Sequence, residues 1–325
     1  ITLLPAESAR IAAVAYLYCR ILDTYEDLIP HATERETALA AFGARFALGN
    51  GASPSPAPTI DTERARDPRD RTHVVLVNRC HLVDEVFRTL TLHARGNIAD
   101  LVDSMAAGMT WSSRTFGNQG GVLQDRDQLS RYCRNVIGLP FLFAVRLLHQ
   151  QRTGSSTVSE QLREDCLRAG EMVQLANITR DIEKDLRRGV AYHPALGADV
   201  GRSDRDDPEL RKRIRHVREE LLVQALGMAP AYERMMRALP FRAVSLTRAS
   251  GVLMLLFTDR YYRSCARRAG RAPWPGPRSA ISLMLLSAGH VVSARWSART
   301  VRRITERFVQ FARQGDGSMD APEAS

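Results

Sequence analysis

Two stretches of the sequence bring carboxylates together at helical spacing. In the first, Arg20, Asp23 and Asp27 follow Tyr16 at intervals of four, three and four residues, which places the four side chains along one stripe of a helix. Glu26 lies beside this stripe, three residues after Asp23. Like charges at this spacing cost about 0.2–0.5 kcal/mol even in an isolated helix, and the flanking residues here are apolar. A divalent cation would neutralise such a semi-buried cluster.

The second stretch repeats the arrangement. Asn177, Asp181 and Asp185 are spaced by four and four residues, and Arg180 is adjacent to their stripe. Mg²⁺ prefers hard oxygen ligands and usually keeps waters and substrate phosphates in its shell. Two helices that each offer carboxylates would therefore hold a Mg²⁺–diphosphate, with Arg20 and Arg180 on phosphate oxygens. A single such stripe is common on solvated helix faces, whereas two, each with an arginine and an apolar flank, favour the metal site.

The elements that position these residues are predicted to be helical, since apolar residues recur every three or four positions and no alternating strand pattern appears. The pattern predicts helices over 5–29, up to about 48, 72–92, 98–109, from about 125 onward, 158–186, 207–226, 229–269 and 278–313, with Pro240 and the proline cluster at 273–277 as breaks among the last three. Gly138 and Pro140 predict a kink in the helix that begins near 125. We expect 51–71 to be an exposed loop because it is rich in proline, and 315–325 to be a polar tail. The predicted fold is therefore all-α, with one large domain over 1–314.

Composition narrows the class of protein. With 325 residues, 44% apolar and 25% charged, the chain is neither disordered nor fibrous. The net charge of +10 indicates an anionic partner, either nucleic acid, a membrane surface or a phosphorylated substrate. Five scattered cysteines favour the reduced thiols of a cytosolic protein over a disulfide framework or a zinc site. The apolar run 280–294 is too short to span a bilayer. Because the chain begins with Ile1 rather than Met, we expect a fragment or a processed chain.

Four blocks of the sequence resemble a known family. The segments YLYCRILDTYED (16–27) and QLANITRDIEKDLRRGVAYHP (174–194) resemble the two aspartate-rich motifs of the squalene/phytoene synthases, which are head-to-head trans-prenyltransferases. Between them, MAAGM (105–109) and RYCRNVIG (131–138) resemble the intervening helices in the expected order. The resemblance covers most of 2–195. It implies an isoprenoid-synthase-type helical bundle around a central cavity.

The resemblance also implies roles for individual residues. Tyr132 matches the tyrosine that the family uses in the first half-reaction, although it could equally pack beside the predicted kink. Gln174 and Tyr16 match cavity-lining positions, where ordinary packing is the alternative. The residues implied to bind Mg²⁺ and diphosphate come from the two motifs: Asp23, Glu26 and Asp27 from one wall, Asn177, Asp181 and Asp185 from the other, and Arg20 and Arg180 on phosphate.

The implied chemistry is a Mg²⁺-dependent condensation of two allylic isoprenyl diphosphates, farnesyl or geranylgeranyl, through a cyclopropyl diphosphate. The DTYED form of the first motif favours squalene, which requires NADPH, whereas the DLRRGVAYHP ending fits phytoene or dehydrosqualene, which do not. Two departures from the family stand out. The segment WSSRTF (111–116) lacks the expected acidic character, and a Ser-Arg-(Thr/Ser)-Phe element that precedes the first motif in the family is missing here.

Three other functions are compatible with parts of the sequence. A non-catalytic helical assembly factor of the same superfamily is disfavoured because the carboxylates are retained, and a terpene cyclase fits the Tyr132 block poorly. The basic segment 209–220 is better explained as a solvated helix face than as a nucleic-acid site, so no nucleic acid partner is expected. We expect a cytoplasmic enzyme, and its greasy substrate and product are compatible with peripheral contact at a membrane.

Overall fold

The computed structural model describes residues 6–47, 55–202, 207–277 and 279–319, with only the backbone described at Ala47 and at 315–319. Within these ranges the regular structure is helical and there is no strand; an isolated bridge pairs Val122 with Ala191. The predicted all-α class is therefore confirmed. By its packing the chain divides into two compact units, Ile1–Gly121 and Val122–Ser325. The single domain over 1–314 and the central cavity stay predictions.

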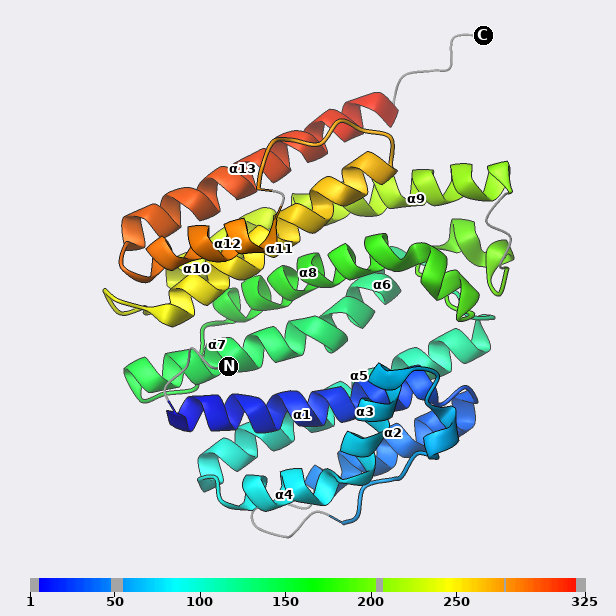
Figure 1. The fold of residues 1–325 in the computed structure, drawn as a ribbon, viewed down its shortest axis with the longest axis vertical. Coiled ribbons are helices and arrows are strands. Elements are labelled where there is room, and N and C mark those ends of the chain that lie inside the picture. Colours follow the sequence, from blue (N-terminus) through cyan, green and yellow to red (C-terminus); the bar gives the residue numbers. More distant parts are fainter. Residues whose placement is uncertain (1–5, 48–54, 203–206, 278, 320–325) are drawn as a thin grey trace. The chain divides into compact units, whose positions relative to one another are not determined.

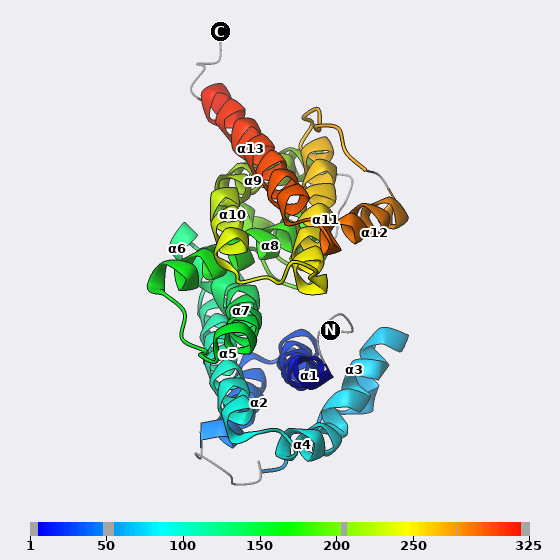
Figure 2. The ribbon, with the colours of Figure 1, turned by 90° about the vertical axis from the view of Figure 1, so that its left-hand side faces the viewer.

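The N-terminal unit packs its helices around α1, which Figure 2 shows nearly end-on with α2 and α5 on one side and α3 and α4 on the other. Its elements are α1 (Ala6–Leu28), α2 (Ala32–Ala47), η1 (Thr62–Arg64), α3 (Pro68–Asn78), α4 (Cys80–Arg88) and α5 (Leu92–Asn118).

The rotation of α1 is fixed by its buried aromatic side chains. The rings of Tyr18 and Tyr25 contact Phe42 of α2 at centroid distances of 6.0 and 5.7 Å. The Tyr18 hydroxyl donates to Asp84 at 2.7 Å, and Arg45 pairs with the same carboxylate at 2.6 Å. Because this face of α1 is fully buried, the carboxylate stripe is left on the half-exposed side of the helix.

The C-terminal unit is organised around α8, which contacts α7, α9, α10 and α11 (Figure 1). Its elements are α6 (Arg126–Cys133), the π-helical turn η2 (Arg134–Gly138), α7 (Leu139–Thr153), α8 (Glu160–Arg187), η3 (Pro194–Asp199), α9 (Pro208–Gly227), α10 (Ala229–Ala238), α11 (Leu246–Arg268), α12 (Ala280–Ala288), η4 (Gly289–Val291) and α13 (Ala294–Met319). The prediction of a long helix over 158–186 is confirmed. Where Gly138 and Pro140 predict a kink, the π-helical turn η2 ends at Gly138 and Pro140 lies in the first turn of α7; the kink itself stays a prediction.

Several predicted helix limits are wrong. The stretch 72–92 is two helices, and the first of them begins at Pro68 because Asp67 caps it by accepting the Asp70 N–H at 2.8 Å. The stretch 98–109 is the middle of α5, which is more than twice as long. The break expected at Pro240 is confirmed, since α10 ends at Ala238 and α11 begins at Leu246, whereas the helix expected over 278–313 is interrupted at η4.

The segment expected to be an exposed loop is anchored to the unit. Ile60 is buried, and its backbone N–H and C=O both pair with the side-chain amide of Asn78 at 2.9 Å. The Tyr25 hydroxyl donates to the Pro58 carbonyl at 2.5 Å. The expectation of a wholly exposed loop is therefore wrong for this part of 51–71. The expected tail is helical to Met319. Residues 48–54 and 320–325, and the expectation about the start of the chain at 1–5, lie outside the described residues.

Candidate active site

The first motif lies on the C-terminal half of α1. Arg20 pairs with Asp23 at 3.3 Å, and about a quarter of each side chain is exposed. The Tyr16 ring is half exposed and lies 5.8 Å from the Arg20 guanidinium, while Asp27 is exposed. The structure therefore brings Tyr16, Arg20 and Asp23 together along the stripe that their spacing predicts.

Two carboxylates of α1, Asp23 and Glu26, resist ionisation. Burial raises the pKa of Asp23 to about 6, with Arg20 opposing the shift and the charge of Asp27 adding to it. Burial also raises the pKa of Glu26 to about 8, helped by the charges of Asp27 and Asp23. Glu26 is therefore mostly protonated at neutral pH in the metal-free protein. A cation bound at this cluster would stabilise the ionised carboxylates that the protein alone destabilises.

Ser112 of α5 lies beside Glu26, and the charge of Arg35 of α2 acts on it from nearby. The Ser112 hydroxyl is 3.5 Å from Glu26 Oε1, and Arg35 Nε donates to the neighbouring Ser113 hydroxyl at 2.8 Å. Arg35 also donates to the Ile29 carbonyl at 3.0 Å, just beyond the end of α1. The serines of the segment WSSRTF thus lie where we expected acidic residues, and they add no further negative charge beside Glu26.

The second motif lies on the C-terminal half of α8. Asn177 donates its side-chain amide to Gln174 at 3.1 Å, and Gln174 is buried. Arg180 binds Asp181 through two hydrogen bonds of 2.9 and 2.6 Å. Asp185 is half-buried and lines the same small cavity as Tyr192, which lies near the end of the same motif, beyond α8.

The pKa of Asp181 is shifted in the direction opposite to the pKa values of Asp23 and Glu26. Burial opposes ionisation of Asp181, but the Arg180 hydrogen bonds and the charges of Lys184 and Arg268 outweigh it and lower the pKa of Asp181. The Arg180 guanidinium also lies 5.1 Å from the centre of the Tyr261 ring. Arg180 is therefore held beside the motif, as its spacing predicts, with part of its hydrogen-bonding capacity directed to Asp181.

Tyr132 is buried at the end of α6, where the chain enters η2. Its hydroxyl lies 3.1 Å from that of Tyr192, and the two ring centroids are 5.1 Å apart. Because Tyr192 lies at the end of the second motif and lines the cavity with Asp185, the structure brings Tyr132 next to this motif through Tyr192, a residue that the sequence did not single out. Tyr192 stands in the quoted block DLRRGVAYHP, yet nothing in that block says which side chain Tyr192 meets.

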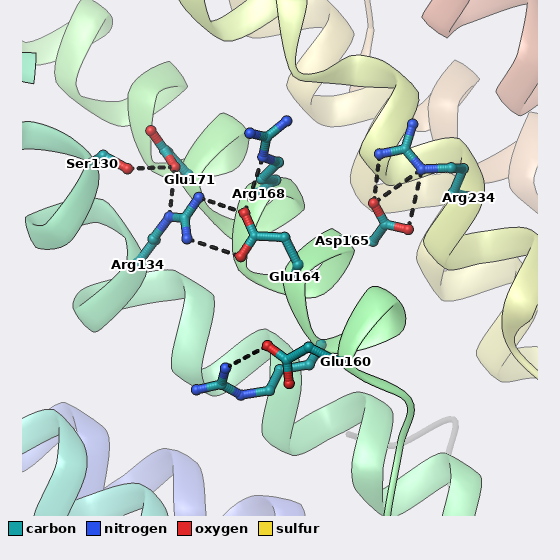
Figure 3. A network of polar contacts seen from close by, with 9 residues as sticks. Ser130, Arg134, Glu160, Glu164, Asp165, Arg168, Glu171 and Arg234 are labelled. Atoms are coloured by element: carbon teal, nitrogen blue, oxygen red, sulfur yellow. Dashed lines mark hydrogen bonds and ion pairs between the residues drawn. The ribbon is translucent and has the colours of Figure 1, made fainter. Parts of the chain in front are cut away.

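A polar network ties η2 to α8 (Figure 3). The buried carboxylate of Glu171 accepts hydrogen bonds from Ser130 at 2.9 Å and from Arg134 at 3.1 Å. Arg134 also forms two bonds to Glu164, of 3.0 and 2.8 Å. Ser130 and Arg134 lie two residues before and two residues after Tyr132, so their bonds to α8 hold in place the turn that carries the Tyr132 side chain.

Two glycines allow η2 and α8 to touch. A Cβ atom on Gly170 would lie 2.5 Å from the Cα of Gly138 and 2.7 Å from its nitrogen, so only a glycine fits at this position. The sequence predicts a kink at Gly138 but gives no role to Gly170, because a glycine in the middle of a long helix does not show which other segment packs against it. The close contact lets the π turn lie directly on α8.

The donor set fits Mg²⁺, since both motifs offer only oxygen ligands through carboxylate and amide groups. Among the described residues, no three His, Cys, Asp or Glu side chains gather closely enough to hold a metal ion by themselves. Such a set suits an ion whose shell is completed by water and substrate phosphate. The Nε of Arg20 is buried without a hydrogen-bond partner among those residues, which leaves a cationic donor beside Asp23 unsatisfied.

The fold is that of the all-α isoprenoid synthases. The squalene synthase TcSQS in complex with the ligand BPH1237 matches with a TM-score of 0.62 at 13% sequence identity, covering 97% of this chain and 93% of that chain. The complex of TcSQS with E5700 matches with a TM-score of 0.56 at 15% identity and the same coverage. A search among curated proteins finds no match.

The chain belongs to the squalene/phytoene synthase family, because the model of that family matches residues 1–278. It is a prenyltransferase, and its family joins isoprenyl diphosphates head to head and generally depends on Mg²⁺. None of the helices in the described ranges combines the length and apolar character needed to cross a membrane.

Proposed function

We propose that this chain joins two molecules of farnesyl diphosphate through a cyclopropyl diphosphate and reduces the product to squalene with NADPH. The observation that carries the proposal is the carboxylate cluster of α1. Burial there raises the pKa of Asp23 to about 6 and that of Glu26 to about 8, a state that a cation and its diphosphate would relieve.

The first half-reaction breaks the C–O bond of one allylic diphosphate, and the diphosphate leaves with the electron pair. The double bond of the second molecule attacks the allylic cation, and loss of a proton closes the cyclopropane ring. In the second half-reaction the remaining diphosphate would leave, and NADPH, when bound, would supply the hydride that reduces the rearranged cation to squalene. An apolar surrounding protects both cations from water.

The residues proposed to hold Mg²⁺ and diphosphate are those of the two motifs: Asp23, Glu26, Asp27, Asn177, Asp181 and Asp185. When bound, Mg²⁺ would stabilise the negative charge that develops on the leaving diphosphate. Arg20 and Arg180 would bind phosphate oxygens. Arg180 now pairs with Asp181; with substrate bound, Arg180 would pair with phosphate and Asp181 with the metal ion, so each side chain would keep a partner of opposite charge. Gln174 and Tyr16 are proposed to line the substrate site.

Tyr132 is proposed as the catalytic tyrosine of the first half-reaction. Its contact with the Tyr192 hydroxyl at 3.1 Å orients the phenol, and the network around Glu171 keeps its backbone in place. Removal of a proton from a carbocation needs only a weak base, which a neutral phenol or the departing diphosphate can provide.

Squalene is preferred over phytoene and dehydrosqualene because of the DTYED form of the first motif. The ending DLRRGVAYHP supports the reductant-free products instead, from farnesyl or geranylgeranyl diphosphate. The likeness to TcSQS, at 13% identity, supports the fold and leaves the choice of product to experiment.

The test is to incubate the protein with each diphosphate and Mg²⁺, with and without NADPH, and to measure diphosphate release and identify the hydrocarbon. Squalene that forms only with NADPH supports the proposal. A C40 product, or a C30 product that NADPH does not change, refutes the squalene branch. Absence of diphosphate release under every condition refutes the catalytic assignment of the motifs.

Replacement of Tyr132 by Phe tests the catalytic tyrosine. We expect turnover to fall at least about 100-fold, the usual contribution of a positioned acid or base, with little change in melting temperature. Tyr192→Phe is the matched control: it removes the same hydrogen bond but leaves the Tyr132 hydroxyl, and should cost less. Equal losses in the two variants would show that the hydrogen bond, and not the Tyr132 hydroxyl, is what matters.

A further inference from the structure

The exposed face of α12 is apolar. Every exposed side chain of this helix is apolar, and Ile281 and Leu285 are both 71% exposed, with Met284 at 55% and Leu286 at 39%. The inner face contributes the buried Leu283. A surface helix normally shows the reverse pattern, and a contiguous exposed apolar patch marks a contact site.

The apolar surface continues beyond α12. Val292, just after η4, is 69% exposed, and Val244 on the neighbouring loop is 62% exposed. The two are joined through their neighbours, because the Ser245 N–H donates to the Val291 carbonyl at 2.8 Å. We use the name α12 patch for Ile281, Met284, Leu285, Leu286, Val292 and Trp296.

Trp296 is a rigid member of the α12 patch. Its indole ring packs on Gly289 so closely that a Cβ atom there would lie 1.7 Å from the ring, and its centroid is 4.5 Å from that of His290. The ring nevertheless stays 43% exposed. A tryptophan held in place with one side open is the type of residue that anchors proteins at membrane–water interfaces.

The part of the chain that carries the α12 patch is rich in arginine in its sequence, although some of these arginines, such as Arg248 and Arg263, are buried. Between Ala238 and Thr305 the sequence has twelve arginines, no lysine and one acidic residue, Asp259. Asp259 is buried and paired with Arg263 at 3.0 Å, so it offers no negative charge to a partner. Arg295 and Arg299, on either side of Trp296, are exposed.

We propose that the α12 patch docks on the surface of an anionic lipid bilayer, with its apolar side chains among the acyl chains and Arg295 and Arg299 at the headgroups. Apolar side chains flanked by arginine, with a tryptophan at their edge, are the composition of interfacial membrane anchors. A protein partner would need an acidic surface around an apolar centre, whereas an anionic bilayer supplies both at once. The surface lies beyond the 1–278 family match, and the inference does not depend on which isoprenyl diphosphate the enzyme uses.

The test uses the full chain and vesicles of phosphatidylcholine with or without about 30% phosphatidylglycerol. We expect cosedimentation with the anionic vesicles that weakens with salt. Vesicles with brominated acyl chains should quench the tryptophan fluorescence of the protein. Because only three tryptophans are present and Trp274 is buried, Trp296→Phe should remove most of this quenching.

Two variants separate the apolar and the charged contributions. Leu285→Glu and the double change Arg295→Glu/Arg299→Glu should each weaken vesicle binding about tenfold or more. The matched controls lie on the N-terminal unit: Leu82→Glu, at a leucine that is 48% exposed, and Arg69→Glu/Arg71→Glu. Both controls should bind as the unchanged protein does.

Three outcomes would overturn the proposal. Equal binding by Leu285→Glu and Leu82→Glu would show that the α12 patch is not the contact, and equal binding to neutral and anionic vesicles would remove the role of arginine. Failure of every form to bind vesicles, with a dimer by light scattering that Leu285→Glu dissociates, would assign the patch to a second copy of the chain. Melting curves of each variant identify any loss of binding caused by unfolding.

Discussion

Replacing Glu26 by Gln should stabilise the metal-free protein, and the gain should grow with pH. Glu26 has its pKa raised from 4.5 to about 8, mainly by burial. An unfolded chain releases this proton near pH 4.5, whereas the folded protein keeps it until about pH 8. The stability that depends on the protonated Glu26 is therefore fully present below the unfolded pKa and is lost as pH rises through the folded one. The amide of Gln does not ionise in this pH range, so the Glu26→Gln variant does not lose this stability as pH rises.

The size of the effect follows from the shift. Each pKa unit corresponds to about 1.4 kcal/mol, so the gain of Glu26→Gln is under about 1 kcal/mol at pH 5 and about 3 kcal/mol at pH 7, and it levels off above pH 8. Other groups titrate in the same range, including Asp23, whose pKa is raised to about 6. These groups are the same in both proteins, so their contribution cancels when the unfolding free energy of the unchanged protein is subtracted from that of Glu26→Gln.

The assay is urea denaturation followed by far-ultraviolet circular dichroism, in EDTA, at steps from pH 5 to 9. Glu85→Gln is the matched control, because Glu85 is exposed on α4 of the same unit and its replacement should change stability by less than about 0.5 kcal/mol at every pH. Addition of Mg²⁺ above pH 8 should stabilise the unchanged protein more than Glu26→Gln. A gain that does not vary with pH, or a variant less stable than the unchanged protein at pH 8, would refute the reasoning.

Two further predictions concern the contact between η2 and α8. Gly170→Ala should lower stability by about 1–3 kcal/mol or more in thermal denaturation, because the new methyl group meets the backbone of Gly138, while Gly227→Ala, where nothing lies within 4 Å, should not. Arg134→Met should cost about 3 kcal/mol because it leaves the buried carboxylate of Glu171 without its cation, and adding Glu171→Met should restore much of the loss; a double variant no better than the single one would contradict this.

The helices were predictable because each buries one apolar face, which places apolar residues at regular intervals of three or four along the sequence. The long helix α8 shows this best, since its bounds, Glu160–Arg187, lie within two residues of the predicted 158–186. The interruption of 229–269 was not predictable to the same degree. Pro240 marks a break, but the length of the gap depends on Arg248, which is buried and donates to the carbonyls of Arg242 and Ala243. Those contacts appear only once the chain is folded.

The candidate site was predictable as a set of helix faces and not as a set of contacts. Spacing placed Arg20 beside Asp23 correctly, because neighbours on one helix are fixed by its geometry. Spacing could not reveal that Tyr132 meets Tyr192, which is sixty residues away, or that Ser112 lies beside Glu26. Contacts between elements depend on tertiary packing, which a periodic pattern does not encode.

The two aspartate-rich stripes share a spacing and differ in electrostatics, and the difference lies in the cations around them. On α1 the single pairing of Arg20 with Asp23 does not compensate for burial, so the pKa values of Asp23 and Glu26 are raised. On α8 the two bonds from Arg180, with other basic residues nearby, outweigh burial and lower the pKa of Asp181. A divalent cation should therefore stabilise the ionised carboxylates of α1 more than that of Asp181 on α8. On α1 the ionised form lacks sufficient cationic partners, whereas on α8 Arg180 already compensates it. The net charge of +10 thus says little about the site itself, because basic residues compensate the carboxylates of one stripe and are scarce at the other.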